Sequence, residues 1–154
     1  MVDKIVVIGI GNILMKDDGI GPKLVQRIRR AASRIGVRCI ETGTLDLAVV
    51  AEIANADGMV VIDAVDFGGT AGQAVLLDEN DLLAVSGNNL WSAHQFGLVE
   101  ALQIAKNQKR QTVVKIIGIQ PAEIDWGLEL SASLQENMPI LAGIVMSQVH
   151  LLKG

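Results

Sequence analysis

Three side chains that can bind a metal or move a proton stand where apolar segments end or a helix begins. Asp18 closes the glycine-rich run GIGNILMKDD at 9–18, Asp63 closes the apolar run VVID at 60–63, and His94 lies in SAHQFGL at 92–98. In an open α/β sheet, the carboxyl ends of the strands meet at one crevice. Two carboxylates and one imidazole at that crevice would suit a divalent transition metal.

The elements that must position these side chains alternate along the chain. Short apolar, β-branched runs predict buried strands at residues 4–9, 37–41, 58–63, 73–77 and 112–119. Between them, helical patterns cover 22–35 and 45–55, and a further pattern runs from about residue 133 to the C-terminus. This alternation predicts an α/β fold in one domain, 1–154. The fold should have three layers, α/β/α, with a mostly parallel, roughly five-stranded sheet as the middle layer.

Local signals set the expected helix ends. Pro22 predicts the first helical position and Gly36 the end of that helix. Ser92 and Gln95 form a Ser-x-x-Gln capping box, so a helix should start at Ala93, with His94 in its first turn.

The C-terminal pattern carries two further signals. Ser133 and Glu136 form a second possible capping box. Pro139 lies inside the pattern and predicts either a kink or a new helix start capped by Asn137.

Composition excludes several classes of function. The net charge of −4 and an aromatic content of 3% argue against nucleic-acid binding. Polar residues or glycine interrupt every apolar run well before the length of a membrane span, and the N-terminus lacks the pattern of a signal peptide. The single cysteine, Cys39, cannot form an internal disulfide, so a reducing cytoplasm is the simplest expectation.

Each candidate residue also has an ordinary structural explanation. Asp17 and Asp18 precede a helix, where carboxylates commonly cap free N–H groups. Asp63 could end a turn, and His94 could be a core or surface histidine. Cys39, inside a predicted strand, is expected to be a small apolar residue rather than a nucleophile.

Gly9 and Gly11 also invite a dinucleotide-binding interpretation. The third glycine of G-x-G-x-x-G would fall at position 14, which is Leu14. Glu41, at the end of the second strand, is a candidate for the ribose contact. The incomplete fingerprint makes nicotinamide binding the weaker hypothesis.

Taken together, the segments resemble the [NiFe]-hydrogenase maturation endopeptidases. That family carries G-x-G-N-x-L-x-x-D-[DE]-x-x-G after the first strand, D-A after the third, and H-Q-x-G-L at a helix start. This chain has GIGNILMKDDGIG at 9–21, DA at 63–64 and HQFGL at 94–98, followed by GIQP at 118–121, similar to the family's G-[IV]-x-P stretch. The order and spacing of these segments match from end to end.

The resemblance implies both an activity and a set of site residues. The family's metal-contacting positions fall on Asp18, Asp63 and His94, with Asp18 at a position that is often Glu. Glu41 stands where relatives carry an acidic residue after the second strand, commonly Asp, and is a secondary catalytic candidate. The implied reaction removes a C-terminal extension from the precursor of the hydrogenase large subunit.

In the family, nickel already placed in the precursor serves as the recognition element, so the metal would arrive with the substrate. Either a cation that polarises the scissile carbonyl or activates water, or a carboxylate acting as general base, could drive hydrolysis. The expected protein is a cytoplasmic monomer or weak oligomer.

Two other classes of function stay open at this stage. One is a non-catalytic α/β adaptor that binds a nucleotide or a metal, and the other is a nicotinamide enzyme. Neither alternative needs His94, so the role of that residue separates the endopeptidase from both.

Overall fold

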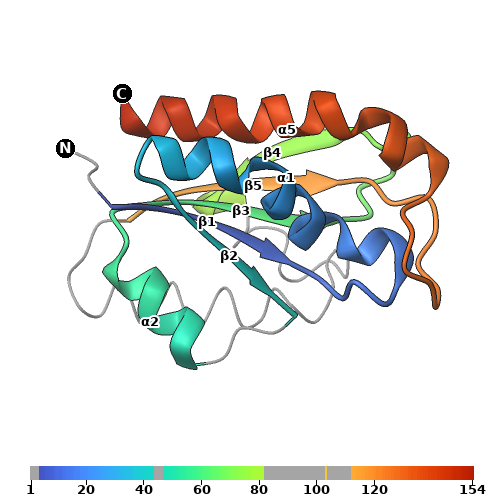
Figure 1. Ribbon diagram of the computed structural model, residues 1–154, viewed down its shortest axis with the longest axis horizontal. Helices are drawn as coiled ribbons and strands as arrows, with labels where there is room; N and C mark the ends of the chain where they lie inside the picture. Colours follow the sequence, from blue (N-terminus) through green and yellow to red (C-terminus); the bar gives the residue numbers. More distant parts are fainter. Residues whose placement is uncertain (1–3, 44–46, 82–102, 104–111) are drawn as a thin grey trace.

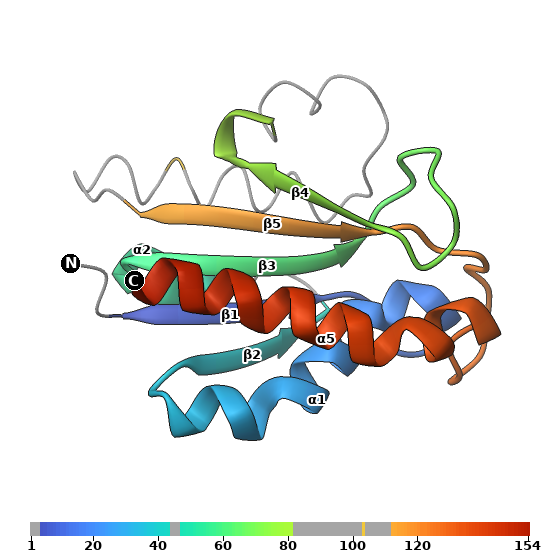
Figure 2. The ribbon, with the colours of Figure 1, turned by 90° about the horizontal axis from the view of Figure 1, so that it is seen from above.

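The computed structural model describes residues 4–43, 47–81, 103 and 112–154. Within them, one sheet has the strand order β2-β1-β3-β5-β4 (Figures 1 and 2). The strands are β1 (Ile5–Ile10), β2 (Arg38–Thr42), β3 (Gly58–Ala64), β4 (Ala74–Asp78) and β5 (Val113–Ile119). All neighbours pair in parallel except β4 and β5, which are antiparallel. The predicted α/β fold with a mostly parallel five-stranded sheet is confirmed.

Helices cover both faces of this sheet. Helices α1 (Ile20–Arg34) and α5 (Ala132–Lys153) lie side by side on one face, and α2 (Leu47–Asn55) lies on the other (Figure 1). A short 3-10 helix, η1 (Lys16–Gly19), precedes α1. Among the described residues, no helix combines the length and the apolar character that a membrane crossing requires.

Burial on both faces explains the continuous apolar strands. All seven residues of β3 are buried. Val60 and Ile62 pack with α1 and α5, whereas Met59 and Val61 pack on the face that carries α2. Because neither face of the strand meets water, the sequence shows an unbroken apolar run rather than an alternating pattern.

Two glycines let α1 rest directly on the sheet. A Cβ built on Gly9 would lie 2.3 Å from the carbonyl oxygen of Gly21, and a Cβ on Gly21 would lie 2.5 Å from the carbonyl oxygen of Ile62. The first turn of α1 therefore contacts the backbones of β1 and β3 without a side chain between them.

The ends of α1 agree with the sequence signals within two residues. The helix begins at Ile20, so Pro22 is its third residue and not its first. Pro22 is still tolerated there, because the first four N–H groups of a helix lack intrahelical partners. Gly36 follows the helix with φ 75°, in the left-handed region, as predicted for a helix stop.

The last helix starts within two residues of the prediction, but the possible capping box from Ser133 to Glu136 was wrong. Helix α5 begins at Ala132, with Ser131 as N-cap, so Ser133 lies inside the first turn. The helix also continues through Pro139 to Lys153, so of the two alternatives given for Pro139, a kink or a restart capped by Asn137, the restart is wrong. Pro139 is exposed, and the buried side of the helix packs on the sheet, which compensates for the one backbone hydrogen bond that proline cannot make.

Candidate functional site

The strand order of the sheet reverses between β1 and β3, and two of the candidate residues, Asp18 and Asp63, lie on segments near this point. The chain passes from β1 outward to β2 and returns to β3 on the other side of β1. In such sheets, ligands bind outside the carboxyl ends of the strands at the reversal. Asp63 is the penultimate residue of β3, and Asp18 lies in η1, which follows β1.

The strand register brings these two segments to the same edge. Gly9 pairs with Ile62, so Ile10 and Asp63 are the next residues along their strands. The loop that leaves β1 carries Asp18 back over this edge. Residues of η1 contact β3, so the segment that carries Asp18 lies against the strand that carries Asp63. That the side chains of Asp18, Asp63 and His94 form one site stays a prediction.

The carboxylate of Asp18 is held by one backbone contact. Its Oδ2 accepts the N–H of Asn12 at 2.9 Å, which closes the glycine-rich loop upon itself. The carbonyl oxygen of Asp18 would lie 1.9 Å from a Cβ on Gly11, so only glycine fits there. Within the described part of the chain, no hydrogen bond engages Oδ1 of Asp18, a half-buried residue. That oxygen can accept a further partner.

Asp63 is the more buried of the two carboxylates. Its exposed fraction is 3%, and its Oδ1 accepts the N–H of Ala64 at 2.8 Å. A charged group at such burial needs compensating contacts or a bound cation. The position of Asp63, at the end of a fully buried strand, fixes its backbone firmly.

The neighbouring aspartate, Asp17, has a different role. It is fully buried and accepts three backbone N–H groups: Oδ2 from Ala122 at 2.8 Å and Glu123 at 2.9 Å, and Oδ1 from Ser131 at 2.7 Å. Burial by itself raises the pKa of Asp17, but these N–H groups outweigh it, and the pKa lies below its ordinary value.

The alternative that Asp17 and Asp18 cap α1 is wrong. The N-cap of α1 is Gly19, and no side chain makes a capping hydrogen bond there. Asp17 binds the 121–131 loop, and Asp18 binds the loop that follows β1.

Backbone pairing joins these two loops further. The N–H of Lys16 donates to the carbonyl of Gly127 at 2.8 Å, and the N–H of Gly127 donates to the carbonyl of Leu14 at 2.9 Å. The Lys16 ammonium also pairs with Glu123 at 2.8 Å. The 121–131 loop is thus fastened beside the segment that carries Asp18.

Glu41 lies at the same edge, but its carboxylate is engaged. Oε2 pairs with the Arg29 guanidinium at 2.7 Å, and Oε1 accepts from the side-chain amide of Gln26 at 2.7 Å. Glu41 also lines a hollow of about 630 Å³ beside the glycine-rich loop. The other residues of that hollow are Gly11, Asn12, Ile13, Leu14, Pro22, Thr42 and Gly43.

Gln120 organises the loop that follows Asp63, a role that sequence reasoning missed. Its side-chain oxygen accepts the N–H groups of Phe67 at 2.9 Å and Gly69 at 3.1 Å, and its amide donates to Asp66 at 3.0 Å. This hydrogen bond and the N–H of Gly68 hold the pKa of Asp66 below its ordinary value. The only signal for Gln120 in the sequence was its place in the GIQP segment.

His94 and the Ser92–Gln95 capping box lie outside the described residues, so their predicted positions stay predictions. Among the residues that are described, no three His, Cys, Asp or Glu side chains are grouped to hold a metal. A three-residue set that includes Asp18 and Asp63 would therefore need a residue outside the described ranges, and His94 is the one that the sequence predicts.

Cys39 has the environment expected of a structural residue. It is half-buried in β2 and packs against the core beneath α1. Burial raises the pKa of its thiol, and the Arg29 guanidinium only partly opposes this effect. A protonated thiol is a poor nucleophile.

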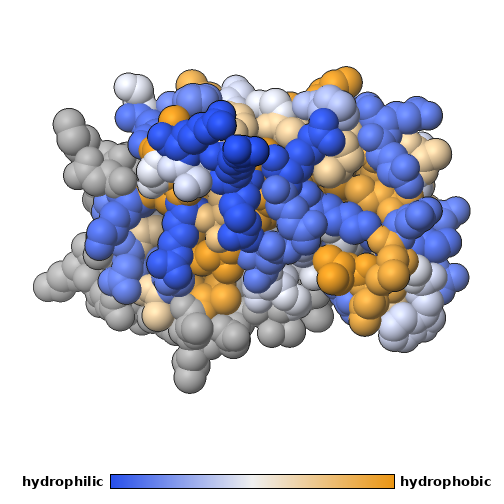
Figure 3. Space-filling view, viewed as in Figure 1, coloured by the Kyte–Doolittle hydropathy of each residue, from blue (hydrophilic) through white to orange (hydrophobic). Residues whose placement is uncertain are grey.

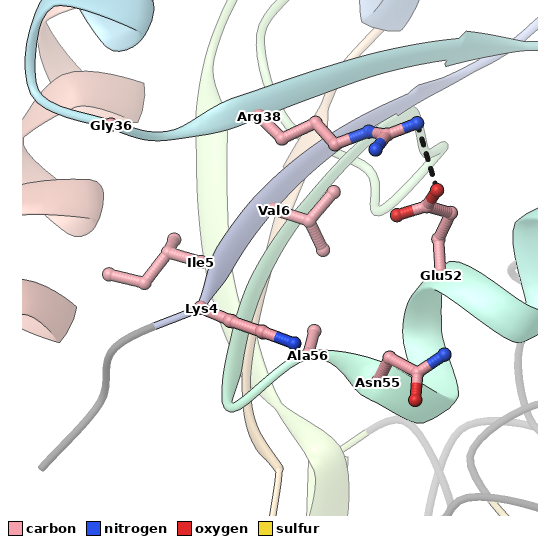
Figure 4. A pocket seen from close by; sticks show the side chains of 8 residues that line it. All are labelled: Lys4, Ile5, Val6, Gly36, Arg38, Glu52, Asn55 and Ala56. Carbon is pink, nitrogen blue, oxygen red and sulfur yellow. Dashed lines mark ion pairs between the residues drawn. The ribbon is translucent and has the colours of Figure 1, made fainter.

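A second hollow, of about 260 Å³, lies at the opposite edge of the sheet (Figure 4). It is lined by the start of β1, including Lys4 and Ile5, and by Asn55 near the end of α2. Arg38 and Glu52 form an ion pair of 2.8 Å across it. This hollow is at the amino end of β1 and does not include any predicted site residue.

Comparison with known proteins gives consistent results. The family model described as hydrogenase maturation protease, HycI, matches residues 4–148. The hydrogenase expression/formation protein HupD of Rhodobacter capsulatus is 34% identical over 128 residues, covering 80% of this chain and 60% of that protein. HupD of Bradyrhizobium diazoefficiens is 32% identical over 139 residues, covering 88% of this chain and 72% of its own length. The chain thus spans about 60% of the length of the first of these relatives.

Solved structures share the fold. The hydrogenase maturating endopeptidase HybD from E. coli superposes with a TM-score of 0.82 at 20% identity, covering 96% of this chain and 93% of that one. The [NiFe] hydrogenase maturation protease HybD from Thermococcus kodakarensis gives a TM-score of 0.76 at 27% identity, covering 95% and 99%. Since the family model matches nearly the whole chain, this protein belongs to the hydrogenase maturation protease family.

Proposed function

We propose that this chain is an endopeptidase that removes the C-terminal extension of the [NiFe]-hydrogenase large-subunit precursor. Family membership favours peptide hydrolysis over the adaptor and nicotinamide alternatives. The observation that carries the proposal is that η1, which holds Asp18, contacts β3, which holds Asp63, at the point where the strand order reverses. There, Asp18 keeps one carboxylate oxygen without a hydrogen bond among the described residues.

In this proposal the nickel ion is part of the substrate. Asp18, Asp63 and His94 would complete the coordination of nickel already bound in the precursor. Two carboxylates and an imidazole suit a divalent transition metal, which supports this donor set. The exposed fraction of Asp63 is 3%, and at such burial water screens the attraction between a carboxylate and a cation less than at the surface.

Hydrolysis also requires activation of water or of the scissile carbonyl. The substrate's cation could polarise the carbonyl or lower the pKa of a water, and a carboxylate could instead accept the proton of that water. Asp18 has an available oxygen, whereas both oxygens of Glu41 already accept hydrogen bonds from Arg29 and Gln26. A role for Glu41 as the base would first require these contacts to break, so the geometry favours Asp18.

The experiment compares four variants on nickel-loaded precursor, with loss of the tail followed by mass. Asp18→Asn and Asp63→Asn keep the side-chain shape but remove the charge, and His94→Ala removes the imidazole. Mutation of residues behind a metal ligand commonly costs 10- to 100-fold, so loss of a direct ligand should slow trimming by at least about 100-fold.

Glu41→Gln is the matched control at the same edge of the sheet and should trim within about threefold of the unmutated protein, because its ion pair with Arg29 is partly exposed to water and contributes little. Melting curves establish that each variant is folded. Normal trimming by folded Asp18→Asn and Asp63→Asn would contradict the proposed site. Loss of trimming in Glu41→Gln alone would instead identify Glu41 as the catalytic base.

A further inference from the structure

Five large apolar side chains stand exposed on the two paired loops beside Asp18. We call them the paired-loop surface: Ile13, Leu14, Ile124, Trp126 and Leu128. Trp126 is 73% exposed and Leu128 64% exposed. Figure 3 shows apolar side chains gathered at the lower right of the molecule, over the loops that follow β1 and β5. Clustered exposure of this kind marks an interaction site, whereas single exposed apolar residues do not.

This surface is held in place before any partner binds. The backbone of Gly127 pairs with those of Leu14 and Lys16. The buried carboxylate of Asp17 anchors both ends of the 121–131 loop, and the Lys23 ammonium donates to the carbonyl of Leu128. A rigid surface loses little conformational entropy on binding, which favours specific association.

The charges around the surface limit the kind of partner. Glu123, Asp125 and Glu129 alternate with the apolar residues of the loop and are all exposed. Of these, Glu123 pairs with Lys16. A complementary partner therefore has an apolar centre bordered by basic residues.

The surface is also continuous with the proposed site. Asp17, which anchors the loop, is the direct neighbour of Asp18 in η1. A protein seated on Trp126 and Leu128 would thus be held beside the carboxylates at the end of β1 and β3.

We propose that the paired-loop surface docks the folded body of the large-subunit precursor through an apolar patch with a basic border. The proposal rests on the proposed function and adds a substrate-binding surface to it. Trp126 is the anchor, since exposed tryptophans in the centre of such surfaces carry much of the binding energy. A second copy of this chain is the less suitable occupant, because a two-fold contact would place the same acidic border against itself.

The test uses Trp126→Ala and Leu128→Ser, with Leu151→Ser as the matched control. Leu151 is 68% exposed near the end of α5 and does not belong to the surface. Affinity for purified nickel-free precursor is measured by biolayer interferometry, and kcat and KM are measured on nickel-loaded precursor. We expect the two surface variants to bind at least about tenfold more weakly and to raise KM with kcat unchanged within about twofold. Leu151→Ser should behave as the unmutated protein.

The outcomes separate this surface from the proposed function. If the unmutated protein binds the precursor but does not trim it, and the surface variants bind more weakly, the proposed function fails and the docking surface stands. Unchanged affinity and KM in both surface variants would overturn the docking proposal, as would an unmutated protein that does not bind the precursor. A dimer in sedimentation that Trp126→Ala dissociates would assign the surface to a second copy and would also overturn it.

Discussion

Replacing Asp17 by Asn should destabilise the protein strongly, although the two side chains have nearly the same shape. The carboxylate accepts three backbone N–H groups in a fully buried position. Asn offers one oxygen, which can keep the two donors Ala122 and Glu123, but its amide then faces the N–H of Ser131. A hydrogen bond to a charged acceptor contributes about 1.5–3 kcal/mol, and the two remaining bonds lose their ionic character.

The lost hydrogen bond from Ser131 and the two weakened bonds from Ala122 and Glu123 together predict a loss of about 3 kcal/mol in the free energy of unfolding. For a domain of this size, 1 kcal/mol shifts Tm by roughly 2–4 °C, so Tm should fall by roughly 6–12 °C at pH 7. Asp18→Asn is the matched control, because Asp18 is half-buried and accepts a single N–H, from Asn12. It should change stability by about 1 kcal/mol or less.

The pH dependence gives a second test of the same contact. The folded-state pKa of Asp17 lies below its ordinary value. Its stabilisation is therefore complete above the unfolded pKa of about 3.9 and is lost as the pH falls through the folded-state pKa. The difference in Tm between the unmutated protein and Asp17→Asn should thus narrow below about pH 4. An Asp17→Asn protein that melts within 2 °C of the unmutated one at pH 7 would refute this account of Asp17.

Two further predictions concern the elements around the site. Gly21→Ala should lower the free energy of unfolding by about 2 kcal/mol or more, because its Cβ would lie 2.5 Å from the carbonyl oxygen of Ile62. Gly143→Ala should raise the free energy of unfolding by roughly 0.5–1 kcal/mol, because Gly143 has open space around it in α5. Thermal melting of both variants checks the pair, and equal Tm values would contradict the close packing of α1 on the sheet. Cys39→Ala should retain trimming of nickel-loaded precursor, since burial keeps its thiol protonated; a folded but inactive Cys39→Ala would instead show a cysteine mechanism.

The strands could be predicted because burial on both faces leaves a strong signal. The run around Val60 and Ile62 is apolar throughout, and its end at Asp63 marks the edge of the sheet where Asp18 also lies. Helix α1 was equally clear, since Pro22 and Gly36 mark its two ends within two residues. These signals are local, so a single sequence is enough to detect them.

The role of Asp17 could not be predicted, because its partners are distant in the sequence. Ala122 and Ser131 lie 105 and 114 residues further along the chain. The prediction of a capping box at Ser133 failed for the same reason. The N–H of Ser131 donates a hydrogen bond to Asp17, and the helix starts just after Ser131 and not after Ser133. Nothing in the local sequence distinguishes such an anchor from a helix cap.

The central claim, that the enzyme recognises nickel carried by its substrate, is tested most directly by two precursors and one unmodified enzyme. Purified large-subunit precursor is prepared with and without nickel, incubated with the enzyme, and analysed by mass for loss of the C-terminal extension. The proposal predicts trimming of the nickel-loaded precursor and an intact nickel-free precursor. Equal trimming of both would contradict nickel recognition through Asp18, Asp63 and His94, even if the enzyme proved to be a peptidase.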